Sequence, residues 1–143
     1  MEITPLHTFG WQKEQDLLTR METDQGLKMY KRQERFSVLD FDTSKRNHFV
    51  ELKSRTTKHW RQNVGEWFVP SCKVKNLNPK QSLTLYYYWA NDDTLWRLDY
   101  DAQLFAGFRE QVPEHHTERH LYIPDSVWSF VGNGSPSGWM GED

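Results

Sequence analysis

The chain has 143 residues, a formal net charge of −2, and Phe, Trp or Tyr at 15% of its positions. This length suits one domain with its own core. The single cysteine, Cys72, excludes an internal disulfide framework and a multi-cysteine zinc site. No apolar run reaches the roughly 18 residues that a membrane-spanning helix needs, and the first residues lack a signal-peptide pattern. We therefore expect a cytoplasmic protein without membrane contact.

The first half of the chain predicts one helix followed by a strand hairpin. Residues 11–26 carry apolar side chains at helical spacing, and this pattern ends at a glycine. Residues 36–42 and 47–54 are typical of strands, and the short polar link between them favours an antiparallel hairpin. Residues 56–66 have no clean period, so we expect a loop or a short irregular helix there.

The second half predicts short helices alternating with strands. In chain order, the predicted elements are a helix at 71–77, strands at 83–90 and 94–100, a helix at 101–110 capped by Asp101, a strand at 119–124 and a short element at 125–131 capped by Asp125. Residues 132–143 are rich in Gly and Ser and predict a flexible tail after a domain spanning 1–131. This order of elements predicts an α/β (α+β) domain with a mixed sheet.

Acidic and basic side chains fall on one face of the predicted hairpin. Glu51 and Lys53 are two residues apart on a strand and therefore share a face. If Thr43 pairs with His48 across the link, Asp40 lies opposite Glu51, where two carboxylates repel unless a cation lies between them. Oxygen ligands of this kind suit Mg²⁺ or Mn²⁺. Lys53 then supplies a positive charge that orients or deprotonates a water molecule.

Two further carboxylates belong to this hypothesis. Asp42 projects from the same strand face as Asp40, and a register shifted by two residues places Asp42 opposite Glu51 instead. Both aspartates therefore remain candidates. In the helix predicted at 11–26, Glu14 lies within the apolar stripe, where a carboxylate is costly unless another group pairs with it.

The segments FSVLDFD and NHFVELKSR resemble the PD-(D/E)XK nuclease superfamily, and most closely its small phage and large-virus members. This resemblance covers residues 11–100 and implies a restriction-endonuclease-like fold, with a mixed β-sheet core flanked by helices. The family's motif aspartate matches Asp40, and its acidic-x-Lys motif matches the tripeptide at 51–53. Leu39 stands where the name-giving proline would be.

The resemblance also implies a metal-dependent active site. Lys53 would position the attacking water, and a lysine of the next helix, either Lys73 or Lys75, would assist. The implied catalytic residues are Glu14, Asp40, Glu51, Lys53 and Lys73, and the implied metal ligands are Glu14, Asp40, Glu51 and the backbone carbonyl of Leu52.

The function implied by the resemblance is hydrolysis of phosphodiester bonds by a Mg²⁺-dependent (or Mn²⁺-dependent) nuclease. We expect DNA as the substrate in preference to RNA, including branched or replicating viral DNA in the host cytoplasm, and a homodimer by analogy with the family. The stretch at 55–61 interleaves basic and aromatic side chains, with Arg55, Lys58 and Arg61 suited to phosphates and Trp60 suited to stacking on a base. A solvated loop anchored by one Trp explains that stretch equally well.

Two other functions remain open from the sequence. A catalytically inactive module with the nuclease fold would bind nucleic acid or a host protein through the aromatic hairpin 85–96, which includes Tyr86, Tyr88 and Trp96. A small viral antagonist of a host protein is a third hypothesis. The histidines at 115–120 favour a solvated loop over a zinc site, because His116 and His120 have ligand spacing only on a helix.

Overall fold

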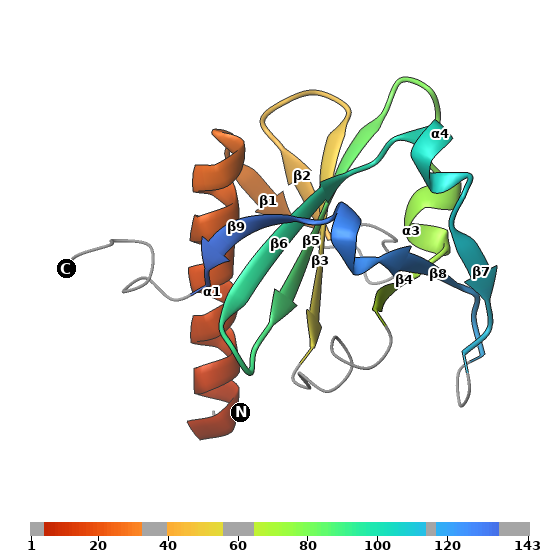
Figure 1. Ribbon diagram of the computed structural model, residues 1–143. Helices are drawn as coiled ribbons and strands as arrows, with labels where there is room; N and C mark the ends of the chain where they lie inside the picture. The colour runs from red at the N-terminus through yellow and green to blue at the C-terminus, as the bar shows by residue number, and fades with distance from the viewer. Residues whose placement is uncertain (1–4, 33–39, 56–64, 114–116, 135–143) are drawn as a thin grey trace.

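The computed structural model of the chain describes residues 5–32, 40–55, 65–113 and 117–134, with side chains from residue 13 onward. The elements in chain order (Figure 1) are α1 (Pro5–Gln25), β1 (Met29–Lys31), β2 (Phe41–Thr43), β3 (His48–Arg55), β4 (Glu66–Pro70), α3 (Cys72–Lys75), β5 (Ser82–Trp89), β6 (Thr94–Asp99), α4 (Ala102–Phe105), β7 (Arg109–Gln111), β8 (His120–Pro124), the 3-10 helix η1 (Asp125–Val127) and β9 (Ser129–Asn133).

The main sheet has six strands in the order β1-β2-β3-β5-β6-β9. Strands β3 and β5 run parallel, and every other neighbouring pair in this sheet is antiparallel. The connection between the two parallel strands contains β4 and α3, as a crossover between parallel strands requires. The predicted mixed sheet and α+β class are thereby confirmed.

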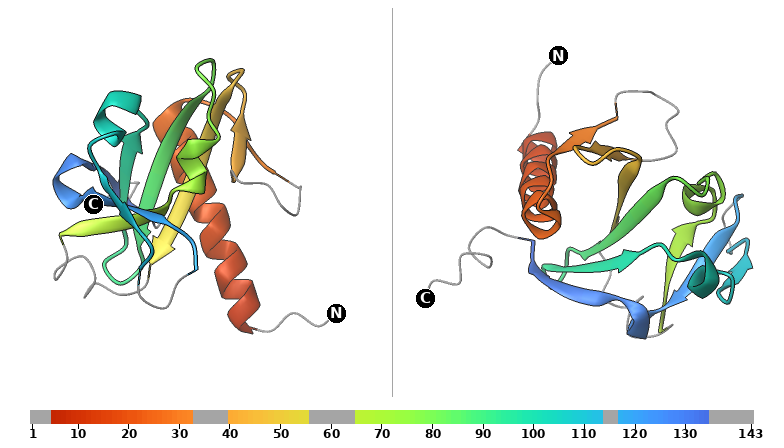
Figure 2. Two further views of the ribbon diagram at one scale, coloured as in Figure 1. Left: turned by 90° about the vertical axis from the view of Figure 1, so that its right-hand side faces the viewer. Right: turned by 90° about the horizontal axis from the view of Figure 1, so that it is seen from above.

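Different layers cover the two faces of this sheet. Helix α1 lies along one face (Figure 2), where Leu17 and Met21 pack against Val50 and Tyr86. The opposite face packs against a three-stranded sheet, β4-β8-β7, together with the short helix α3. The expected flanking by helices therefore holds for α1, but on the other face a second small sheet supplies most of the cover, because β4 pairs with β8.

A cluster of aromatic rings fills the space between the two sheets. Trp67 of β4 is 2% exposed and lies at its centre. Its ring centroid is 5.1 Å from that of Tyr87 and 5.1 Å from that of Trp128, and the rings of Trp89 and Trp96 lie within 5.6 Å. The high aromatic content of the sequence is therefore mainly a means of building this core.

Several predicted boundaries change because short strands join the sheets. Strands β1, β4 and β7 were not predicted, since β1 and β7 have three residues each and β4 is an apolar run without alternation. The short element predicted at 125–131 divides into the 3-10 helix η1 and the strand β9, which was not predicted as a strand either. The helix predicted at 101–110 ends at Phe105, because residues 109–111 pair with β8 instead. Asp101 caps that helix as predicted, accepting from the Leu104 N–H at 3.0 Å, but Asp125 makes no side-chain cap.

The chain remains part of the sheet beyond the predicted domain end at residue 131. Strand β9 continues to Asn133, and the Gly134 N–H donates to the carbonyl of Asp93 at 3.2 Å. Arg20 of α1 holds this strand in place, because its guanidinium donates to the Val131 carbonyl at 2.8 Å. The rest of the predicted tail, 135–143, lies outside the described residues.

Replacement of Gly134 by alanine is expected to destabilise the protein. A Cβ atom there would lie 2.5 Å from Tyr88 Cε1 and 2.9 Å from Leu17 Cδ2, so packed side chains would have to shift. We expect the free energy of unfolding in urea to fall by about 1–3 kcal/mol. Gly107→Ala is the matched control, since its Cβ would meet its nearest atom at 3.6 Å. Equal stability of the two variants would contradict this packing.

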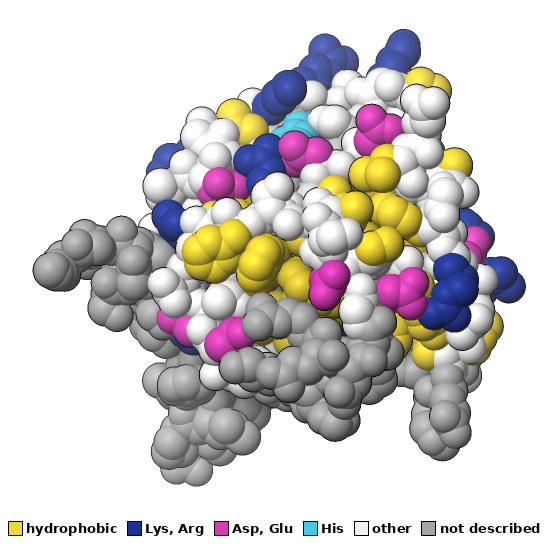
Figure 3. All heavy atoms as spheres, viewed as in Figure 1, with side chains coloured by type: hydrophobic (Ala, Val, Ile, Leu, Met, Phe, Trp, Pro, Cys, Tyr) yellow, Lys and Arg dark blue, Asp and Glu magenta, His cyan; other side chains and the backbone are white. Residues whose placement is uncertain are grey.

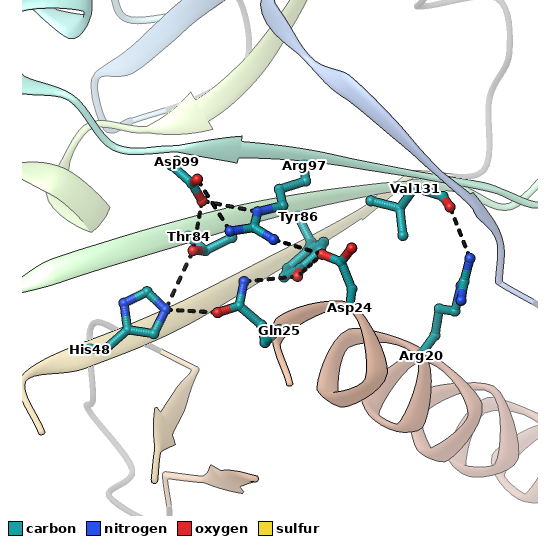
Figure 4. Close-up of polar contacts among 9 residues, drawn as sticks. All are labelled: Arg20, Asp24, Gln25, His48, Thr84, Tyr86, Arg97, Asp99 and Val131. Atoms are coloured by element: carbon teal, nitrogen blue, oxygen red, sulfur yellow. Dashed lines mark hydrogen bonds and ion pairs between the residues drawn. The ribbon is translucent and has the colours of Figure 1, made fainter. Parts of the chain in front are cut away.

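A polar network joins the C-terminal end of α1 to the main sheet (Figure 4). His48 is 9% exposed, and its Nε2 donates to Gln25 Oε1 at 2.9 Å while its Nδ1 accepts from the Ser82 hydroxyl at 2.7 Å. Arg97 of β6 donates to Asp24 of α1 at 3.1 Å. The helix is thus tied to three strands, β3, β5 and β6.

The contribution of His48 to the stability of the protein is expected to fall as the pH falls below the ordinary histidine pKa. The difference between the unsubstituted protein and His48→Gln isolates this contribution from that of Glu51, whose raised pKa acts in the opposite direction. Burial, then the charge of Lys45, lowers the pKa of His48; Arg97 adds to this effect and Asp99 opposes it. His48 of the unfolded chain is therefore protonated near pH 6.5, whereas His48 of the folded protein is protonated only at a lower pH. Urea unfolding between about pH 7.5 and 5.5 measures this slope. An unchanged slope in His48→Gln would contradict the assignment to His48.

Candidate active site

The register of β2 and β3 places the predicted acidic pair together. Phe41 pairs with Val50 and Asp42 with Phe49, so Asp40 comes next, opposite Glu51. At this point the two acidic side chains accept hydrogen bonds from backbone N–H groups of the facing segment. Glu51 Oε1 accepts from the Asp40 N–H at 3.1 Å, and Asp40 Oδ2 accepts from the N–H of residue 52 at 3.0 Å. The predicted register is therefore confirmed.

A cavity of about 290 Å³ opens beside this pair, between β3 and the β4–α3 segment. The charged side chains that line it come from four parts of the chain. They are Asp40 beside β2, Glu51 and Lys53 of β3, Lys73 of α3 and Glu118 ahead of β8. Leu52 and Trp128 also line this cavity. Of the five predicted catalytic residues, all except Glu14 therefore line this cavity.

Glu51 is the most perturbed acid in this cavity. Its side chain is buried, with 6% of the residue exposed. Burial, then the neighbouring charge of Asp40, raises the pKa of Glu51 to about 8, although Lys73 acts in the opposite direction. A buried carboxylate beside a second carboxylate is stabilised by any further cation that enters.

Lys73, and not Lys75, reaches the acidic pair. Its Nζ lies 3.0 Å from Glu51 Oε2, whereas Lys75 Nζ lies 2.7 Å from Glu110 Oε2 on the outer strand β7. Burial lowers the pKa of Lys73, but the charges of Glu51 and Asp40 raise it by more, so this lysine stays protonated. Of the two candidate lysines of α3, Lys73 is therefore the one that the structure brings to the acidic pair.

Lys53 lines the same cavity, but its pKa is shifted in the opposite direction from that of Lys73. Burial, then the positive charges of Arg55 and Lys73, lowers the pKa of Lys53. A lysine with a lowered pKa releases its proton more readily, which suits proton transfer to or from a water molecule. The pKa values of the two lysines in the cavity therefore shift in opposite directions, upward for Lys73 and downward for Lys53.

Two predicted carboxylates lie outside this cavity. Asp42 lies opposite Phe49 and accepts from the Arg32 guanidinium at 2.7 Å, so Asp40 is the aspartate that faces Glu51. Glu14 forms an ion pair with Lys31 and lines an adjacent cavity of about 410 Å³ that Asp40 also borders. Among the residues described, no three acidic, histidine or cysteine side chains form a group that could hold a metal.

The predicted nucleic-acid-binding stretch lies mostly outside the described residues. Lys58, Trp60 and Arg61 fall there, as do His115 and His116. Arg55 ends β3, and its Nε donates to the Tyr87 hydroxyl at 3.3 Å. His120, the other histidine of the zinc alternative, is 2% exposed and its Nδ1 lies 3.0 Å from the carbonyl of Glu118.

The aromatic hairpin does not form the exposed binding surface that one alternative requires. Tyr86 and Tyr88 are 1% and 2% exposed, and their hydroxyls donate to Asp24 and Asp93. Trp96 is partly buried and packs against the core. Figure 3 instead shows apolar side chains gathered over β6, β9 and α4, where Phe130 and Leu104 are exposed.

Glu118 and Trp128 are cavity residues that the sequence did not indicate. They lie more than sixty residues from Glu51 in the chain, and they approach it because β8 pairs with β4. Neither belongs to a local motif, so only a pairing of distant strands reveals them.

Comparisons with protein-family models, with curated proteins and with solved structures give no match to this chain. Among the described residues, no helix combines the length and the apolar character needed to cross a membrane.

Proposed function

We propose that this protein is a Mg²⁺- or Mn²⁺-dependent nuclease that hydrolyses phosphodiester bonds in DNA, built on a restriction-endonuclease-like fold. The observation that carries the proposal is the meeting of Asp40, Glu51, Lys53 and Lys73 in one cavity of a mixed sheet. Their order along the chain, with a hairpin followed by a short helix, is the order in which the resemblance to PD-(D/E)XK nucleases requires them.

The donor groups of the cavity suit a hard divalent cation. Asp40 and Glu51 offer two carboxylates on facing strands, and the carbonyl of Leu52 is the third donor implied by the resemblance. Magnesium favours one or two carboxylates and keeps several waters or phosphate oxygens, so two carboxylates meet its needs without Glu14. Bound there, the metal would polarise the scissile phosphate and lower the pKa of a water.

The two lysines have separate roles in this proposal. Lys53 has a lowered pKa and lies two residues from Glu51 on the same strand face, so it orients the attacking water and receives its proton. Lys73 remains a cation and stabilises negative charge that develops on the phosphate. These roles need a proton acceptor and a fixed positive charge near the same phosphate, and the position of both lysines in one cavity supports this assignment.

The test is cleavage of plasmid, single-stranded and branched DNA, and of RNA, with Mg²⁺ or Mn²⁺. Glu51→Gln and Lys53→Met should each lower the cleavage rate by at least about 10²-fold, as expected for loss of a charge-stabilising or proton-transferring group. Lys75→Met is the matched control, because Lys75 pairs with Glu110 outside the cavity. Cleavage that survives both cavity substitutions unchanged would overturn the proposal.

A further inference from the structure

The ion pair between Lys73 and Glu51 places a positive charge at a carboxylate that the proposed metal site would use. Lys73 Nζ lies 3.0 Å from Glu51 Oε2, while Glu51 Oε1 already accepts from the Asp40 N–H. Each oxygen of Glu51 therefore already has a partner in this structure. A divalent cation that binds Glu51 through Oε2 competes with the Lys73 ammonium for this atom, because two cations at one oxygen repel each other.

The side chain of Lys73 is placed so that it can move aside. It comes from a helix of four residues at the edge of the cavity, and 20% of it is exposed, compared with 8% of the Glu51 side chain. A lysine carries its charge on a flexible four-carbon stem, so its ammonium can turn toward solvent without a change of backbone. Asp40 and Glu51, by contrast, are anchored to the strands through backbone N–H groups.

The charges around the cavity favour such an exchange. Without a metal, the ammonium of Lys73 lies against the carboxyl group of Glu51 in the cavity that Asp40 also lines. A divalent cation removes the need for this counter-ion and repels it at short range. The displaced ammonium then requires a new anion, and a phosphate of the nucleic acid provides one at the same cavity.

We infer that Lys73 is a displaceable internal counter-ion that holds Glu51 in the metal-free protein and transfers to a substrate phosphate when a divalent cation binds. This inference rests on the proposed nuclease function. It makes metal binding and nucleic-acid binding mutually reinforcing, since a ligand that draws Lys73 away from Glu51 helps the other ligand to bind, and such coupling is reciprocal.

The first test is Mn²⁺ binding measured by calorimetry in the absence of nucleic acid. Lys73→Met should bind Mn²⁺ about tenfold more tightly than the unsubstituted protein, within the usual range of about 5–150-fold for coupled sites. Lys75→Met, on the same helix but paired with Glu110, should bind Mn²⁺ as the unsubstituted protein does. Thermal unfolding without metal shows whether each variant is folded.

The second test measures the coupling itself with a phosphorothioate oligonucleotide, which resists hydrolysis. Mn²⁺ should strengthen its binding to the unsubstituted protein, and much less so to Lys73→Met. If Lys73→Met does not fold, Lys73→Arg serves instead. Its larger, permanently charged group pairs more firmly with a carboxylate, so this variant should bind Mn²⁺ more weakly than the unsubstituted protein.

The outcomes separate the inference from the nuclease proposal. Mn²⁺ binding that is lost in Glu51→Gln but is equal or weaker in Lys73→Met overturns the counter-ion role and leaves the metal site standing. Mn²⁺ binding in none of the proteins overturns both. Tighter binding in Lys73→Met together with an unchanged Lys75→Met supports the inference.

Discussion

Asp40→Asn is expected to lower the rate of Mg²⁺-dependent DNA cleavage by about 10²–10⁴-fold, as is typical when a group that organises transition-state charge is lost. The substitution removes one of the two carboxylates that face each other across β2 and β3. It keeps an oxygen that accepts the N–H of Leu52, so the local backbone should be preserved. Single-turnover nicking of plasmid DNA measures the effect.

Asp42→Asn is the control that the same strand offers. Asp42 projects from the same face two residues away, but it pairs with Arg32 opposite Phe49 and does not line the cavity. Its side chain is 49% exposed, and loss of such a surface ion pair costs at most about 1 kcal/mol of stability. We expect a cleavage rate close to that of the unsubstituted protein. An equal loss of activity in both variants would contradict the assignment of Asp40.

Trp67→Ala is expected to be the most destabilising substitution in the core. Trp67 is 2% exposed and its ring contacts four other aromatic rings between the two sheets. Removing a buried ring of this size typically costs about 3–5 kcal/mol, which is a large share of the stability of a small domain. Urea unfolding followed by far-ultraviolet circular dichroism measures this loss.

The Trp67 substitution should also disturb the cavity, because its stacking partner Trp128 lines that cavity. Phe130→Ala is the matched control, since Phe130 is 56% exposed and its ring lies 5.1 Å from that of Trp96. We expect it to cost less than about 1 kcal/mol. Similar losses in the two variants would show that the ring cluster does not carry the stability that its packing indicates.

The sequence alone determined the hairpin and limited its register to two alternatives. Alternation with a period of two assigns Glu51 and Lys53 to one strand face, and the short polar link leaves few ways to pair the strands. The structure adopts the register in which Asp40, and not Asp42, lies opposite Glu51. The cap at Asp101 was equally predictable, because a cap depends on neighbouring residues only.

Only the tertiary structure decided which groups approach this hairpin from elsewhere. Lys73, and not Lys75, approaches Glu51 because of the position of α3 directly after β4. Strand β4 is in turn held by pairing with β8, fifty or more residues later in the chain. The ion pairs of Asp42 and Glu14 likewise involve Arg32, which follows β1, and Lys31, the last residue of that strand, which is too short to predict. Pairing between distant strands leaves no periodic trace in the sequence, so these contacts, and the burial of the aromatic hairpin, became visible only in the folded chain.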